Sequence, residues 1–168
     1  MTMPKDIENQ KEFMIEELKR IIRYNDKDLC GFARKIGVSR EYIYMIFNGK
    51  SPFLIDKVVD YYEVYDYVLK VELFKEGDSV YNFCYKDKKT MKDEMVHDLK
   101  RIILDKEGKL SNFGKRLGYK GYYMYALFSG RKKFTYERLF NYLAMYGYYP
   151  KISFIKINET INKDVVAV

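Results

Sequence analysis

Residues 29–50 read LCGFARKIGVSREYIYMIFNGK, and this stretch has the apolar spacing of two short helices joined by a tight turn. Phe32 and Ile36 lie one turn apart on the first helix and face an apolar stripe on the second helix. Gly37 can adopt the left-handed conformation that the turn requires, and Ser39 is a favoured N-cap residue. The stripe consists of Ile43, Ile46 and Phe47. The spacing therefore predicts a helix-turn-helix.

The motif places small, glycine, serine and apolar residues at set offsets, from Phe32-Ala33-Arg34-Lys35-Ile36-Gly37-Val38-Ser39 on to Ile43, Ile46 and Gly49. In this respect it resembles the DNA-binding domain of the Xre/Cro/CI type of phage repressors. The resemblance implies a compact bundle of four helices. It also implies that the second helix of the motif lies in the major groove of DNA.

The motif recurs in the second half of the chain. The shift that carries Leu18 onto Leu99 aligns residues 18–22 with residues 99–103, both of which read LKRII. The same shift, without a gap, produces many further identities, and we call it the repeat shift. Identities at one constant offset indicate an internal duplication. We therefore expect two domains, residues 1–85 and residues 86–168. The further identical pairs include Leu29 and Leu110, Phe32 and Phe113, Gly37 and Gly118, Tyr44 and Tyr125, Tyr61 and Tyr142, and Tyr65 and Tyr146.

Each copy is expected to hold four helices followed by a short β-hairpin, so that the fold class is mainly α. The first helices should span about residues 5–24 and 92–104, and the fourth helices residues 53–65 and 134–146. Alternating apolar residues then predict strands at 67–74 and 79–85, and at 152–157 and 165–168. Because an isolated hairpin is marginal in water, we expect the hairpins to pack on their bundles, or to pair with each other or with a second chain as a homodimer.

The net positive charge of the chain falls in two sequence windows, each of which contains one motif. The chain carries a net charge of +7. Residues 29–52 hold four basic residues against one acid, and residues 110–133 hold six basic residues and no acid. The rest of the chain therefore sums to −2. Two basic windows on a nearly neutral chain indicate a polyanionic partner.

Outward residues of the second helix of each motif are candidates for reading base edges in the major groove. In the first copy these are Ser39, Arg40, Glu41 and Tyr44, and in the second copy Lys120, Tyr122 and Tyr125. Flanking basic residues are candidates for binding DNA phosphates: Arg34, Lys35, Lys50, Lys115, Arg116, Arg131, Lys132 and Lys133. The competing interpretation for each residue is a solvated group on a surface helix.

These residues predict a sequence-specific regulator of transcription, similar to a repressor, that binds double-stranded DNA. Two motifs in one chain would act as a covalent pseudo-dimer on half-sites about 34 Å apart. Ser39-Arg40-Glu41 differs from Lys120-Gly121-Tyr122, so the two half-sites are expected to differ in sequence.

The 18 tyrosines keep a second class of function open. Most of them fall at positions that suit core packing. Tyrosine is also enriched in protein interfaces, and Tyr44, Tyr122 and Tyr125 are expected to face outward. The alternative is a phage-type inhibitor or adaptor that binds a host nucleic-acid-handling protein, such as a CRISPR effector.

Catalysis and cofactor binding are not expected. His97 is the single histidine, and Cys30 and Cys84 lie far apart, so a metal cluster lacks ligands at suitable spacing. No glycine-rich nucleotide fingerprint occurs. The polar first residues and the absence of a long apolar run predict a soluble cytoplasmic protein with reduced thiols and no membrane contact.

Overall fold

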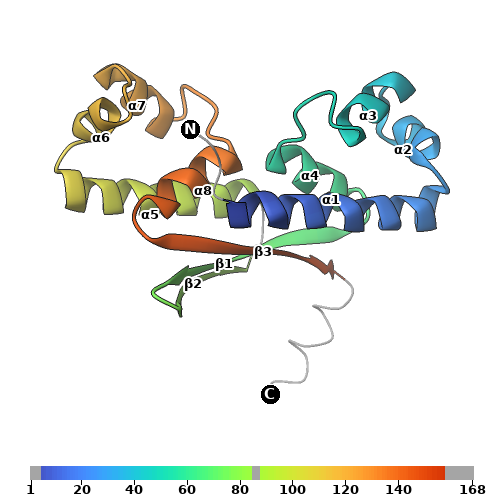
Figure 1. Cartoon of the computed structure of the whole chain (residues 1–168), viewed down its shortest axis with the longest axis horizontal. Helices are drawn as coiled ribbons and strands as arrows, with labels where there is room; N and C mark the ends of the chain where they lie inside the picture. Colours follow the sequence, from blue (N-terminus) through green and yellow to red (C-terminus); the bar gives the residue numbers. More distant parts are fainter. Residues whose placement is uncertain (1–4, 85–87, 158–168) are drawn as a thin grey trace. The chain divides into compact units, whose positions relative to one another are not determined.

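The computed structural model describes residues 5–84 and 88–157. This part of the chain is mainly helical, with eight helices and a small three-stranded antiparallel sheet (Figure 1). The elements in chain order are α1 (Lys5–Asp26), α2 (Leu29–Ile36), α3 (Arg40–Phe47), α4 (Ile55–Glu63), β1 (Tyr67–Lys75), β2 (Asp78–Cys84), α5 (Lys88–Glu107), α6 (Leu110–Arg116), α7 (Gly121–Phe128), α8 (Tyr136–Ala144) and β3 (Tyr148–Lys156).

The chain divides into two compact units. Unit 1 comprises Met1–Val71 and Lys151–Val168, and unit 2 comprises Glu72–Pro150. The division falls inside β1 and inside β3. The expected division into residues 1–85 and 86–168 concerns the sequence repeat, and it stays a prediction.

The helix-turn-helix of unit 1 forms where local sequence signals coincide. Asp28 caps α2 by accepting a hydrogen bond of 2.8 Å from the Gly31 backbone amide. Gly37 ends α2 in the left-handed region, at a φ of 72°, where a side chain would be strained. Ser39 caps α3 by accepting a hydrogen bond of 3.1 Å from the Tyr42 amide. The predicted pair of helices on either side of Gly37 is thereby confirmed.

The core of unit 1 is built from aromatic rings on α2, α3 and α4. The ring of Phe32 meets that of Tyr61 edge to face at a centroid distance of 5.1 Å, and Phe47 meets Phe53 at 5.0 Å. Such pairs add to the free energy gained from burial. The apolar spacing predicts Leu54 on the stripe of the fourth helix, but Leu54 precedes α4 as the N-cap residue and is exposed.

The C-terminal strand packs against the helices of unit 1. Tyr62 of α4 stacks on Phe154 of β3, with ring centroids 3.7 Å apart. The Ile152 backbone amide donates a hydrogen bond of 2.8 Å to the side chain of Gln10 in α1. Residues from the two ends of the chain thus share one core.

Unit 2 repeats the aromatic core with weaker helix signals. Phe113 meets Tyr142 edge to face at 5.0 Å, and Phe128 meets Phe134 at 5.1 Å. No side-chain hydrogen bond caps the N-terminus of α6 or α7 among the described residues. Gly114 allows α6 and α7 to approach closely, since a Cβ there would lie 2.9 Å from Met124 Cγ.

Several elements keep the same bounds under the repeat shift. The shift carries α3 onto α7, α4 onto α8 and β1 onto β3, with both ends coinciding. Helices α1 and α5 are longer than expected at their C-terminal ends, and both end at positions related by the shift, Asp26 and Glu107. The capping-box spacing of Thr90 and Asp93 predicts a helix that begins near residue 92, but α5 begins at Lys88, so both residues lie inside its first turns.

The strand order in the sheet is β2-β1-β3. Glu76 and Gly77 connect β1 to β2, and both have positive φ, as in the tight turns that join antiparallel strands. On its other edge β1 borders β3. The expected partner strand of β3, at residues 165–168, lies outside the described residues, so a second hairpin stays a prediction.

Candidate nucleic-acid interface

The N-terminal turn of α3 presents polar side chains to solvent. Ser39 holds this turn through its capping hydrogen bond, and Arg40 and Glu41 are both exposed. Tyr44, which is expected to face outward, is half-buried instead: its hydroxyl lies 3.9 Å from the Cys30 sulfur, and the Arg40 guanidinium lies 5.3 Å from its ring centroid. The tyrosine ring therefore holds the Arg40 guanidinium on the face of α3 by a cation–π contact.

Basic residues around this motif fall into two groups. Arg34 and Lys50 are exposed and form no ion pair with an acidic residue in the described part of the chain. Lys35, by contrast, pairs with Asp26 at 3.5 Å and lies 4.4 Å from the centroid of the Tyr65 ring. The charge of Lys35 is thus already partly neutralised inside unit 1.

Tyr65 completes this cluster by donating a hydrogen bond from its hydroxyl to Asp26. Burial, followed by the hydrogen bond to Asp26, raises the pKa of Tyr65 well above its usual value. The cluster joins the C-terminal end of α1 to α2 and to the chain after α4. Lys35 therefore has a structural partner as well as the phosphate role expected of it.

Unit 2 contains the same cluster, and the repeat shift relates every member to its counterpart in unit 1. Arg116 pairs with Glu107 at 2.8 Å, and Tyr146 donates a hydrogen bond of 3.0 Å to the same carboxylate. Arg116 also donates a hydrogen bond of 3.2 Å to the Tyr146 hydroxyl. Burial and the bond to Glu107 raise the pKa of Tyr146 to about 12. Arg116, like Lys35, is engaged within its own unit.

Helix α7 presents a more aromatic face than α3, and none of its own residues is charged. Tyr122 is 68% exposed and Tyr125 is 53% exposed, and Lys120 precedes the helix at the exposed N-cap position. Tyr123 stacks on Tyr119 at a centroid distance of 4.6 Å. Hydroxyls of exposed tyrosines can donate and accept hydrogen bonds, but they lack the bidentate geometry of arginine.

The other four predicted phosphate contacts of unit 2 are available to a ligand. Lys115, Arg131, Lys132 and Lys133 are exposed, and among the described residues none of them pairs with an acid. The Lys132 ammonium lies 4.5 Å from the centroid of the Tyr123 ring, which orders this side chain while leaving its charge intact.

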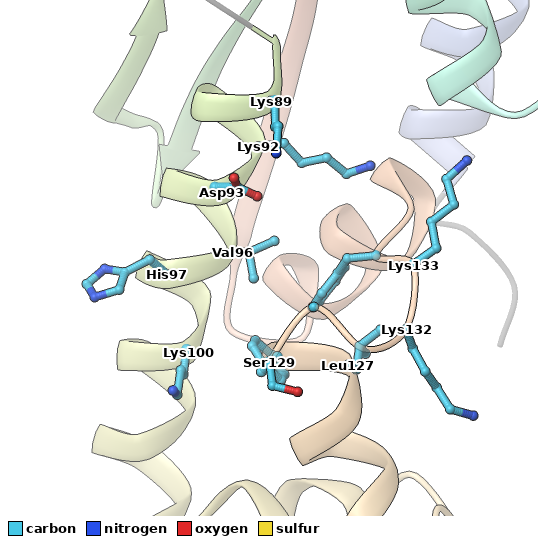
Figure 2. Close-up of a pocket in the computed structure, with 13 residues that line it drawn as sticks. Lys89, Lys92, Asp93, Val96, His97, Lys100, Leu127, Ser129, Lys132 and Lys133 are labelled. Atoms are coloured by element: carbon cyan, nitrogen blue, oxygen red, sulfur yellow. The ribbon is translucent and has the colours of Figure 1, made fainter.

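Lysines on α5 extend this basic surface, although they lie outside the two motifs and were not among the predicted phosphate contacts. Lys89, Lys92 and Lys100 line a hollow of about 590 Å³ together with Lys132 and Lys133 (Figure 2). They lie outside the basic window of residues 110–133. The repeat shift would have singled out Lys89 alone, because it places Glu8 at that position but Lys11 and Lys19 at the positions of Lys92 and Lys100.

No group of three or more candidate ligands for a metal ion occurs within residues 5–84 and 88–157. The helices in this described part also lack the length and apolar character that a membrane crossing requires. The Cys30 thiol is free and half-buried. Comparisons with protein-family models, with curated proteins and with solved structures found no match to this chain.

Proposed function

We propose that this protein binds double-stranded DNA in a sequence-specific manner and regulates transcription in the way that a repressor does. The observation that carries the proposal is a capped α3 whose first turn exposes Arg40 and Glu41, next to Arg34 and Lys50, which lack acidic partners among the described residues. Arginine can bridge the acceptors of guanine, and glutamate can accept from cytosine. The resemblance of residues 32–49 to Xre/Cro/CI repressors supports the same assignment.

We further propose that the chain arose by tandem duplication and acts as a covalent pseudo-dimer. The shared bounds of α3 and α7 and the matching ring contacts of Phe32 and Phe113 support this view. The two reading faces differ, because α3 begins with Arg40 and Glu41 whereas α7 begins with Gly121 and Tyr122. The operator should therefore be asymmetric.

Selection from a random library of duplex DNA tests the proposal. The full chain is expected to enrich one operator with a well-defined half-site and a second, more degenerate half-site about one helical turn away. The variant Arg40→Ala should keep the spacing and lose the preference at one base pair of the defined half-site. No enrichment above the starting library would contradict the proposal.

The exposed tyrosines favour a protein partner as the second candidate function. Tyr122 and Tyr125 place aromatic area on the surface of α7, and aromatic anchors dominate the binding energy of protein interfaces. An inhibitor or adaptor of a nucleic-acid-handling protein would use this face. Loss of partner binding in Tyr122→Ser, together with unchanged DNA selection by that variant, would identify this function.

A further inference from the structure

A groove in unit 2 runs between the N-terminal half of α5 and the segment that joins α7 to α8 (Figure 2). Its volume is about 590 Å³, and Val96, Leu127 and Phe134 form part of its apolar lining. The charged lining residues are Lys89, Lys92, Lys100, Lys132 and Lys133, together with a single acid, Asp93. With His97 neutral, the lining has a net charge of +4. A lining with this net charge attracts anions.

The lysine side chains come from two walls and are partly ordered. Figure 2 shows Lys92 extending from α5 toward the α7–α8 connection, whereas His97 points away from it. The Lys92 ammonium lies 4.5 Å from the centroid of the Tyr136 ring, and the Lys132 ammonium lies at the same distance from that of Tyr123. A cation–π contact holds a lysine side chain without removing its charge, which lowers the entropy lost when a ligand binds.

The equivalent positions of unit 1 lack most of this positive charge. At the positions of Lys89, Lys132 and Lys133, the repeat shift places Glu8, Ser51 and Pro52. Unit 1 keeps lysines only at the positions of Lys92 and Lys100, where the repeat shift places Lys11 and Lys19. Both units form the same aromatic ring contacts although these three positions differ.

We propose that this groove binds the phosphodiester backbone of duplex DNA and adds α5 to the interface, an inference that rests on the proposed function. Lysine ammonium groups serve as point charges for phosphate oxygens. The lysines of α5 line the same groove as Lys132 and Lys133, which follow α7. Lys89, Lys92 and Lys133 are the groove contacts. Unit 2 then supplies most of the electrostatic affinity, and unit 1 supplies most of the sequence reading.

The test compares two triple variants of the full chain that lose the same charge. Lys89→Gln, Lys92→Gln and Lys133→Gln remove the groove contacts, and Lys5→Gln, Lys11→Gln and Lys19→Gln remove three charges from α1. Glutamine and lysine have similar helix propensities, so both helices should persist, which circular dichroism checks. Fluorescence polarisation then measures binding to a labelled duplex from low to moderate salt.

Each lost phosphate contact reduces the magnitude of the slope of log affinity against log salt by about 0.9. The slope measured for the groove variant should therefore be smaller in magnitude than that of the wild type by roughly 2 to 3. Its affinity at about 100 mM salt should fall by roughly 10²-fold, and the α1 variant should change less than about threefold. Wild-type binding with equal losses in both variants would overturn the groove assignment and leave the proposed function standing. Wild-type protein that binds no duplex would overturn both.

Discussion

Arg116 Nη2 lies 2.8 Å from Glu107 Oε1, and this ion pair joins the end of α6 to the end of α5. In unit 1 the corresponding pair is Lys35 and Asp26, at 3.5 Å. The sequence predicts a phosphate contact for both basic residues. Their partners show why a count of basic residues in a sequence window overstates the charge available to a ligand.

Removal of the Glu107 carboxylate is expected to destabilise the protein. Glu107→Ala takes away the ion pair and leaves the Tyr146 hydroxyl without its acceptor, at a cost of about 1–2 kcal/mol in the free energy of unfolding. Urea denaturation measures this cost. Glu94→Ala, an exposed position on the same helix, should change stability by less than about 0.5 kcal/mol. A Glu107 variant as stable as the Glu94 variant would refute the structural role.

Two neighbouring tyrosines should respond in opposite ways to loss of their hydroxyls. The buried Tyr61 hydroxyl has no hydrogen-bond partner among the described residues, whereas Tyr62 donates a hydrogen bond of 2.8 Å to the Met14 carbonyl. Tyr61→Phe should be neutral or stabilise by up to about 1 kcal/mol, and Tyr62→Phe should cost about 1 kcal/mol. Equilibrium unfolding of both variants checks the prediction, and equal losses would contradict it.

The stability of the protein should fall at alkaline pH. Burial raises the pKa of Tyr61 to about 12, and burial with the Glu107 hydrogen bond raises that of Tyr146 to about 12. A tyrosine has a pKa of about 10 in the unfolded chain, so the unfolded state loses these protons first. The stabilisation is complete below about pH 10 and is lost as the pH rises toward about 12. Denaturation at a series of pH values across this window should show the decline, and Tyr146→Phe should make it shallower.

The parts of the fold that short-range signals determine were predictable from the sequence. Gly37 and Ser39 specify a turn and a cap within a few residues, and α2 and α3 begin and end as these residues require. The placement of β3 beside β1 and against Tyr62 was not predictable in this way. It depends on contacts between residues far apart in the chain, which neither periodicity nor turn residues encode.

Sequence reasoning about the candidate site had the same limit. Exposure of Arg40 and Glu41 followed from helical periodicity and agrees with the structure. Asp26 and Glu107 precede the motifs on other helices, so their pairing with Lys35 and Arg116 required the packed bundle. The α5 lysines were missed for the same reason.

Replacing a proposed base-reading residue and replacing a proposed phosphate contact should have different effects on DNA binding. Arg40→Ala removes a candidate bidentate contact with guanine, so it should cost about 1–3 kcal/mol at one base pair and relax specificity there. Lys132→Ala should weaken binding to all sequences alike and reduce the salt slope by about 1. Binding of each variant to a panel of single-base operator changes separates the two effects. A uniform loss for both variants would count against base reading by α3.

The salt dependence of duplex binding tests the central claim most directly. Fluorescence polarisation measures the affinity of the full chain for its selected operator between about 50 and 200 mM salt. If the protein contacts roughly six to ten phosphates, its affinity should fall by roughly 10³- to 10⁵-fold across this range. An affinity that stays within about tenfold, or no binding at the low-salt end, would contradict the assignment of this protein to DNA.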